Sequence, residues 1–361
     1  MINGIIILQL RDVVAPSPTG SVKNMDKILL ILTGGTICSA VKEDGKRAVD
    51  SENAKYKIID NFRKSGSPFS KIDFETKMPI DTLSENMTVD KWNILLNELR
   101  GINSDDYKGI IILHGTDTLA YTACLLSLVM GKKGLPVCLV SSHSPVECEG
   151  TNANVNFRAA VELIMNGIKP NVYAVYQNSD GKIYVHFGAH LLQCASFSND
   201  FYSADMTAVK NTDNASFAGI EFETDGIFPD KLDARVMMLS PYVGIDYECL
   251  NIDNIDAVVH TTYHSQTVCT EGGKSFTGSV LCLAEKSRSA GADLFLAPCN
   301  PETYAYETTG TALEGGIYPV ADLTPEMAYI KLLLGCSLSK RGAELAEFMN
   351  NSINSEKICN K

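Results

Sequence analysis

Residues 27–33 read KILLILT, and this continuous apolar run ends in Gly34, Gly35 and Thr36. A strand that is buried on both faces of a parallel sheet has this kind of sequence. A second such run, GIIIL at residues 109–113, ends in the polar residues HGTD. Because ligands bind at the carboxyl ends of strands in open parallel sheets, both polar ends are candidate parts of a functional site.

The rest of the chain alternates between strand-like and helix-like segments. In the first half, strands are predicted at residues 135–140, 171–177 and 182–187, and helices at 51–64, 89–99, 118–130 and 154–165. In the second half, strands are predicted at 235–240, 256–262 and 293–297, and helices at 277–290, 325–335 and 339–353. This alternation predicts an α/β fold with two domains, each a mostly parallel sheet flanked by helices.

Composition shifts predict where these domains begin and end. Residues 1–24 are rich in Ser, Pro and Gly towards their end, and we expect a loose N-terminal tail, with Met25 as the alternative start of the chain. Residues 25–205 form the predicted larger, catalytic N-terminal domain, and residues 233–361 the smaller C-terminal domain. Between them, residues 206–232 are polar and are predicted to be a linker.

The overall composition argues against several classes of protein. The net charge is -12, with 43 acidic and 31 basic residues, whereas nucleic-acid binding relies on clustered Lys and Arg. No run approaches 18 consecutive apolar residues, so we expect no membrane association through a spanning helix. The 11 cysteines are scattered without a Cys-x-x-Cys pair, which favours reduced, buried thiols and a cytoplasmic protein.

The two polar strand ends carry groups that are useful in catalysis. Thr36 and Thr116 offer hydroxyls and Asp117 a carboxylate, beside glycines that let the backbone turn tightly. A hydroxyl becomes a good nucleophile when a neighbour accepts its proton. A Gly-Gly-Thr turn alone is also typical of a helix start with Thr as N-cap, so the joint presence of both clusters carries the functional interpretation.

The pairing of TGGTI at residues 33–37 with HGTDTLAYTA at residues 114–123 resembles the two signatures of bacterial-type L-asparaginases, within the asparaginase/glutaminase superfamily. TLSENM at residues 82–87 is similar to the family's substrate-binding serine segment, and residues 141–143 to a turn that lines the substrate. The resemblance, closest to the cytoplasmic type I enzymes, implies hydrolysis of L-asparagine to L-aspartate and ammonia. It also implies a homodimer or homotetramer that needs no metal and no organic cofactor.

The resemblance implies a role for each matching residue. Thr36 corresponds to the nucleophile, and Thr116 with Asp117 to the set that activates water or assists proton transfer. The residues implied in binding the amino-acid substrate are Gly35, Ser84, Glu85, Thr116 and Asp117. Backbone N–H groups of the glycine-rich turns would stabilise the oxyanion of the intermediate.

Two positions depart from the family pattern. The family has a Lys after its fifth strand, and an ungapped reading of residues 191–200 puts Asn199 there. Asparagine is neither a base nor a cation. The family also has a Tyr on the loop after the first signature, where this chain has Lys46. Lys46 is therefore a candidate to compensate for the missing Lys.

These departures leave three functional hypotheses open. The first is an asparaginase. The second is a related amidase, such as a glutaminase or an amidotransferase subunit that acts on a tRNA-borne amide; the net charge of -12 and the lack of an extra domain weigh against the subunit. The third is a non-catalytic or weakly active homologue that binds aspartate or asparagine.

His260 and His264 are four residues apart, a spacing that could bind zinc on a helix. They follow an apolar run that reads as strand, where this spacing separates side chains by about 13 Å. We therefore expect no metal site there. His190 is a reserve candidate for a general base, because histidine titrates near neutral pH.

Overall fold

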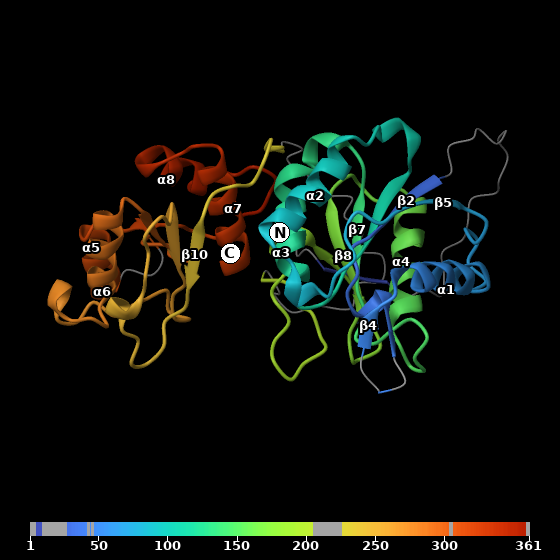
Figure 1. Ribbon diagram of the computed structural model, residues 1–361, viewed down its shortest axis with the longest axis horizontal. Helices are drawn as coiled ribbons and strands as arrows, with labels where there is room; N and C mark the ends of the chain where they lie inside the picture. Colours follow the sequence, from blue (N-terminus) through green and yellow to red (C-terminus); the bar gives the residue numbers. More distant parts are fainter. Residues whose placement is uncertain are drawn as a thin grey trace. The chain divides into compact units, whose positions relative to one another are not determined.

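The structure is a computed structural model that describes residues 5–8, 27–41, 44, 47–204, 226–302 and 306–358 (Figure 1). The chain divides into two compact units, Met1–Phe228 and Pro229–Lys361. Most of the predicted 206–232 linker and of the predicted 1–24 tail lies outside the described residues, so both boundaries stay predictions. No helix within the described ranges is both long and apolar enough to cross a membrane.

The first unit is built on a seven-stranded sheet in the order β1-β9-β8-β7-β6-β2-β5. Its strands are β1 (Ile5–Leu8), β2 (Lys27–Leu32), β5 (Asp73–Lys77), β6 (Gly109–Leu113), β7 (Val137–Val140), β8 (Val172–Gln177) and β9 (Ile183–Phe187). The five strands β5, β2, β6, β7 and β8 are parallel, and β9 and β1 are antiparallel additions at one edge. The carboxyl ends of β6, β2 and β5 are therefore neighbours.

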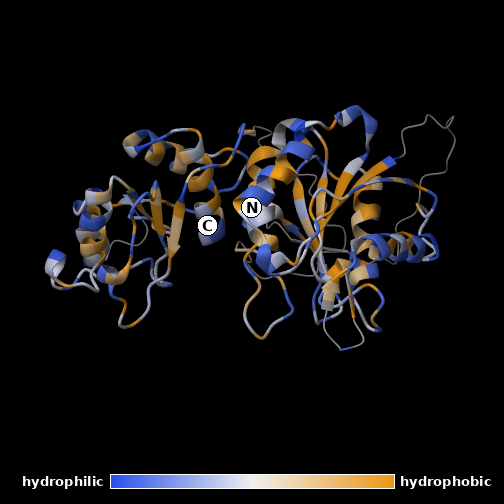
Figure 2. Ribbon diagram, in the orientation of Figure 1, coloured by the Kyte–Doolittle hydropathy of each residue, from blue (hydrophilic) through white to orange (hydrophobic). Residues whose placement is uncertain are grey.

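Helices cover both faces of this sheet (Figure 1). On one face, α1 (Ser51–Arg63) and α4 (Ala153–Met165) pack into a core with alternate residues of β2, β6, β7 and β8. On the other lie α2 (Val89–Arg100), whose N-terminus Thr88 caps, and α3 (Leu119–Val129). Figure 2 shows apolar residues concentrated in the strands and polar residues on the outer faces of the helices. Burial on both faces explains the uninterrupted apolar sequences of β2 and β6.

The second unit has a four-stranded parallel sheet, with flanking helices. Its strands, in sheet order, are β10 (Val236–Leu239), β11 (Ala257–His260), β12 (Asp293–Leu296) and β13 (Tyr318–Pro319). Its helices are α5 (Val280–Ala290), α6 (Glu307–Glu314), α7 (Pro325–Ser337) and α8 (Gly342–Asn350). The prediction of an α/β fold with mostly parallel sheets flanked by helices is confirmed.

Short elements complete the fold. A hairpin of β3 (Ser39–Val41) and β4 (Arg47–Val49) follows the 3-10 helix η1 (Thr36–Cys38). β8 and β9 pair antiparallel and form a second hairpin. Ile5–Leu8, expected in a loose tail, instead pairs with β9, because its extended backbone adds a strand at that edge of the sheet. The expectation is therefore wrong for these four residues.

A buried ion pair ties the end of the chain to the second unit. Lys331 of α7 and Glu356 are both fully buried, and the ammonium donates to the carboxylate. Glu356 also accepts hydrogen bonds from the backbone N–H groups of Ile353 and Asn354, at 2.9 and 3.1 Å. Burial acts to raise the pKa of Glu356, but Lys331 and these N–H groups hold it below its ordinary value.

Candidate active site

Three loops meet at the carboxyl ends of β6, β2 and β5. The backbone N–H of Gly35 donates to the carbonyl of Thr82 at 2.8 Å, and the N–H of Thr82 donates to the carbonyl of Thr33 at 3.2 Å. The hydroxyl of Thr33 in turn donates to the carbonyl of Leu113 at 2.9 Å. These bonds extend the sheet pairing beyond the strands and bring the two threonine motifs and the serine segment to one place.

Two glycines allow the loops to touch. Gly35 has φ +78°, and a Cβ atom built on it would lie 2.3 Å from the Cα atom of Gly115. A Cβ atom on Gly115 would lie 2.4 Å from the hydroxyl oxygen of Ser84. Since real Cβ atoms do not approach other atoms so closely, any side chain at either position would push the loops apart. The contact between the two backbones therefore builds this site.

Ser84 and Asp117 form a polar pair beside these glycines. The hydroxyl of Ser84 donates to the carboxylate of Asp117 at 3.1 Å and accepts from the backbone N–H of Asp117 at 3.2 Å. The hydroxyl of Thr118 donates to the carbonyl of Ser84 at 3.0 Å. Ser84 is buried, whereas Asp117 is exposed. The Asp117 carboxylate is therefore hydrogen-bonded to a buried hydroxyl and remains open to solvent.

The other predicted site residues lie around this pair. Thr36 follows Gly35 at the start of η1, and both Thr36 and Thr116 are half-buried. Glu85 is exposed on the short 3-10 helix η2 (Ser84–Asn86). Lys46 lies outside the described residues. The structure thus brings Gly35, Ser84 and Asp117 together around Gly115. Thr116 lies between Gly115 and Asp117 in the chain, and Thr36 directly follows Gly35.

The segment after β9 reaches the site through Gln193, which was not predicted from the sequence. The side-chain amide of Gln193 donates a hydrogen bond to the backbone carbonyl of Asp117. Asn199, which was predicted to stand at the position of the family Lys, is exposed. The turn η5 (Gly188–His190) precedes this segment, and Gln193 is the residue of the segment that contacts Asp117. No feature of the residue types marks Gln193 in advance.

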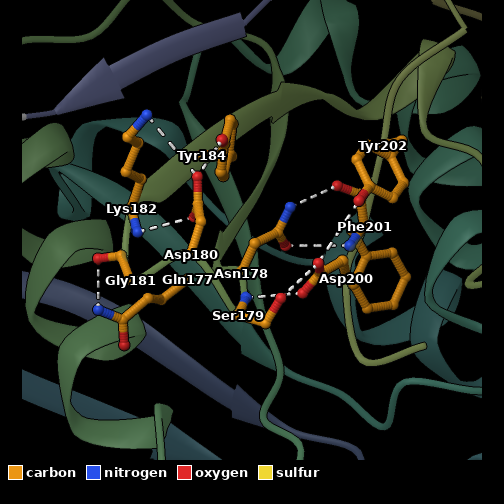
Figure 3. A network of polar contacts seen from close by, with 10 residues as sticks. All are labelled: Gln177, Asn178, Ser179, Asp180, Gly181, Lys182, Tyr184, Asp200, Phe201 and Tyr202. Carbon is orange, nitrogen blue, oxygen red and sulfur yellow. Dashed lines mark hydrogen bonds and ion pairs between the residues drawn. The ribbon is translucent and has the colours of Figure 1, made fainter.

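The far end of this segment is fixed to the turn between β8 and β9 (Figure 3). The side-chain amide of Asn178 exchanges two hydrogen bonds with the backbone of Phe201, each 3.0 Å. The carboxylate of Asp200 accepts from the N–H and the hydroxyl of Ser179, each at 2.7 Å. With both ends of residues 191–204 held on the sheet, Gln193 sits on an anchored segment rather than on a free loop.

His114, the last residue before Gly115, is completely buried. Its Nδ1 lies 2.8 Å from the carbonyl oxygen of Gly115, and its Nε2 lies 2.9 Å from the hydroxyl of Thr122. Burial lowers its pKa to about 4, against weaker opposing effects of Gly115 and Asp117. His114 is therefore neutral at physiological pH. His260 at the end of β11 shows the same pattern, with Nδ1 near the carbonyl of Thr261, Nε2 near the hydroxyl of Tyr247, and a pKa of about 4.

These two histidines predict how stability depends on pH. In the unfolded chain each binds a proton near its ordinary pKa of 6.5, whereas in the folded state each stays neutral down to about pH 4. The unfolded state therefore binds more protons between these values, and stability present above pH 6.5 is lost as pH falls towards 4. We expect a loss of about 3 kcal/mol per histidine, measured by urea unfolding between pH 7.5 and 4.5.

The matched variant His114→Gln removes one titrating group. The difference in unfolding free energy between this variant and the wild type should shrink as pH falls, because only the wild type loses the contribution of His114. A difference that is constant between pH 7.5 and 4.5 would contradict the prediction.

His260 and His264 lie in different surroundings. His260 is buried at the end of β11, whereas His264 is exposed on the loop that follows. Across the described part of the chain, no group of three His, Cys, Asp or Glu side chains could hold a metal ion.

Comparison with known proteins agrees with this arrangement. Residues 27–221 match the family model described as Asparaginase, N-terminal. The chain belongs to the asparaginase family. This asparaginase-family protein is 25% identical over 343 residues to an L-asparaginase of Thermococcus kodakarensis, covering 91% of this chain and 98% of the relative. It is 24% identical over 330 residues to a glutamyl-tRNA(Gln) amidotransferase subunit of Pyrococcus abyssi, covering 86% of this chain and 72% of the relative.

Solved structures show the same fold for this asparaginase-family protein. The thermostable L-asparaginase of Thermococcus kodakarensis matches with a TM-score of 0.72 and 23% identity, over 93% of this chain and 100% of that one. L-asparaginase I of Vibrio cholerae matches with a TM-score of 0.67 and 22% identity, over 92% and 99%. The relatives of this chain therefore include both asparaginases and amidotransferase subunits.

Proposed function

We propose that this protein hydrolyses the side-chain amide of L-asparagine to L-aspartate and ammonia. The contact of Gly35 with Gly115 is the observation that supports this most directly, because it brings the turn that carries Thr36 against the loop that carries Asp117 and beside Ser84. One nucleophile and a carboxylate beside it are the groups that two-step amide hydrolysis requires. Family membership supports amide hydrolysis in general, and the choice of asparagine is our proposal.

In the proposed acylation step, the Thr36 hydroxyl oxygen attacks the amide carbon of the substrate. The hydroxyl proton passes to the leaving nitrogen, which departs as ammonia, and a Thr36 ester of aspartate remains. Backbone N–H groups of the glycine-rich turns hold the oxyanion, a contribution of about 10²–10³ in rate for each donor in other hydrolases.

In the proposed hydrolysis step, water attacks the ester carbon and the Thr36 oxygen regains its proton. Thr116 and Asp117 orient this water and transfer its proton, and Asp117 also binds the substrate ammonium through its open carboxylate. Ser84 holds the substrate's α-carboxylate in this proposal. Glu85, being exposed, contributes through the rim of the site.

The family Lys has no counterpart among the described residues that contact Asp117. Gln193 holds the carbonyl of Asp117 but neither accepts nor carries a proton at neutral pH. We propose Lys46 as the cation that assists proton transfer. The variant Lys46→Met is then expected to lower kcat by about 10²-fold or more, as general acid–base catalysis contributes. Full activity of this variant in an ammonia-release assay would remove Lys46 from the mechanism.

The experiment that tests the function measures ammonia release from L-asparagine and from L-glutamine by the purified protein. We expect turnover of asparagine, and loss of that turnover in both Thr36→Ala and Thr116→Ala. Turnover of glutamine alone would instead support the related amidase. If neither amide is hydrolysed while calorimetry shows that L-aspartate binds, the protein is a binding homologue and the proposed activity is wrong.

Ser84→Ala separates binding from chemistry. It removes the hydroxyl that donates to Asp117 and accepts from its backbone N–H. We expect KM for asparagine to rise about tenfold, with a smaller fall in kcat, because a hydrogen bond to a charged group contributes about 1.5–3 kcal/mol. Ser67→Ala is the matched control, since Ser67 is also buried and donates to a carboxylate, that of Glu162, away from the site. An unchanged KM in Ser84→Ala would contradict the role given to Ser84.

The amidotransferase subunits supply a second candidate function, an amidase that delivers ammonia to a partner. Their similarity to this chain, at 24% identity over 330 residues, is close to that of the asparaginase, at 25% over 343. The net charge of -12 favours a small amino acid over a tRNA-borne substrate.

We propose a homodimer or homotetramer, which light scattering of the purified protein would test.

A further inference from the structure

A buried chain of hydrogen bonds runs from α2 to the candidate site. The indole N–H of Trp92 donates to the hydroxyl of Thr122 at 3.0 Å, and Thr122 lies 2.9 Å from Nε2 of His114. Nδ1 of His114 lies 2.8 Å from the carbonyl oxygen of Gly115. Trp92 is buried, with 6% of its surface exposed, and Thr122 and His114 are completely buried.

The chemistry of these groups determines the direction of each bond. Indole N–H is only a donor and a carbonyl is only an acceptor. Nδ1 of His114 must therefore carry the proton that binds Gly115, and the neutral ring leaves Nε2 as an acceptor. Thr122, which accepts from Trp92, donates its single proton to Nε2. The chain thus selects one tautomer of one histidine, the Nδ1–H form.

We propose that His114, held in this tautomer by Thr122 and Trp92, is a positioning residue that orients the peptide between Gly115 and Thr116 for oxyanion binding. A peptide group is planar and trans, so a carbonyl that points at His114 directs the N–H of Thr116 the opposite way. The inference rests on the proposed amide hydrolysis, in which an N–H at this position faces the substrate oxygen.

The local sequence explains why such a residue is needed. Glycine tolerates many backbone conformations, so Gly115 alone would let this peptide rotate. Gly115 cannot be replaced by a stiffer residue, because its Cα side packs against Gly35 and Ser84. The orientation must therefore be imposed through the carbonyl, and His114 is the side chain that contacts it. Both ring nitrogens of His114 are already engaged, by Gly115 and Thr122, so His114 acts through the peptide.

Two substitutions at position 114 separate positioning from packing. In His114→Asn the side-chain amide nitrogen lies where Nδ1 lies, so the hydrogen bond to Gly115 is kept and the bond to Thr122 is lost. In His114→Gln the amide reaches the place of Nε2, so contact with Thr122 is kept and the bond to Gly115 is lost. Asparagine also leaves the larger cavity, and it should therefore be the less stable variant.

Stability and kcat are expected to rank the two variants in opposite orders. For asparagine hydrolysis, we expect kcat of His114→Gln to fall about 10²-fold with KM nearly unchanged, as for a misplaced oxyanion donor. We expect kcat of His114→Asn to stay within about tenfold of the wild type despite its lower stability. Rates that follow stability, with His114→Asn the slower variant, would overturn the proposal.

His260 offers a matched control in the second unit. It is buried, contacts the next residue's carbonyl through Nδ1 and a hydroxyl through Nε2, and has a similarly lowered pKa. His260→Gln should cost stability much as His114→Gln does while leaving kcat within about twofold, because its ring contacts Thr261 and Tyr247, neither of which belongs to the candidate site. A fall in kcat in His260→Gln as large as in His114→Gln would show a general effect of lost packing and overturn the proposal.

A spectroscopic measurement keeps the inference testable if the wild type hydrolyses no amide or if the variants do not fold. Nitrogen-15 spectra of the six histidines identify the tautomer of each ring, and L-aspartate can be titrated while the amide signal of Thr116 is followed. A neutral Nδ1–H form of His114 and a shift of the Thr116 amide on binding support the proposal. An Nε2–H form, or a Thr116 amide that is insensitive to aspartate, overturns it. Absence of ammonia release alone overturns only the proposed function.

Discussion

Gly35→Ala should abolish activity and lower the stability of the first unit by about 3 kcal/mol or more. The added methyl group would lie 2.3 Å from both the Cα and the N atom of Gly115, and backbone atoms cannot move aside as a flexible side chain can. Overpacking of this kind costs about 1–3 kcal/mol, and an L-residue at φ +78° adds about 1–2 kcal/mol. Separation of the loops by even 1 Å lowers kcat by about 10²-fold.

Gly167→Ala is the matched control for this variant. Gly167 also has φ +78°, but nothing lies within 4 Å of a Cβ atom built on it. The free energy of unfolding of Gly167→Ala should fall by only about 1–2 kcal/mol, the cost of an L-residue in left-handed backbone, and the variant should keep full activity. Urea unfolding and ammonia release measure both variants. Equal losses in the two would mean that backbone strain alone, and not the contact with Gly115, explains the effect.

Glu356→Gln should destabilise the second unit by about 3–5 kcal/mol. Glutamine keeps an oxygen that can accept from the N–H groups of Ile353 and Asn354, so the main change is the loss of negative charge beside the buried ammonium of Lys331. A buried charge that loses its partner is destabilised by this amount. The chain has one tryptophan, Trp92 in the first unit, so its fluorescence and the far-UV circular dichroism together tell which unit unfolds.

Removing the ammonium as well should reverse most of this loss. In Lys331→Met with Glu356→Gln, neither member of this buried pair carries a charge, and we expect stability within about 2 kcal/mol of the wild type. The exposed pair of Asp60 and Lys64 is a control, because Asp60→Asn should change stability by less than about 0.5 kcal/mol. If the double variant is as unstable as Glu356→Gln, the loss does not come from an unpaired charge.

Segments with continuous apolar sequences or clear caps were predicted well. The strands β2 and β6 and the helices α2 and α4 lie within a few residues of their predicted bounds, because burial on one or both faces leaves a strong pattern. The strand β5 and the helix α6 were not predicted. DFETK in β5 has a single apolar residue, and ETTGTALE in α6 has a central glycine and three threonines, so tertiary contacts outweigh local preference.

The site was predicted in its parts but not in its assembly. Residue types and their position after apolar runs identified the threonines and Asp117, and the resemblance added Ser84. The contact of Gly35 with Gly115 depends on which strands are neighbours. The approach of Gln193 to Asp117 and the hydrogen bonds that select the tautomer of His114 depend on how loops and helices pack against the sheet. Strand order is a property of the folded sheet, and a periodic pattern in one segment carries no information about it.

The polar sequence that concealed β5 also protects the sheet. β5 is the last strand in the sheet order, and charged residues alternate with uncharged ones along it, with Lys77 paired to Glu98 and Glu75 paired to Lys27. An outermost strand offers unpaired backbone groups to any other extended chain, and charged side chains oppose such pairing. If β5 were as apolar as β2, its recognition from sequence would be easy, and the protein would be prone to edge-to-edge aggregation.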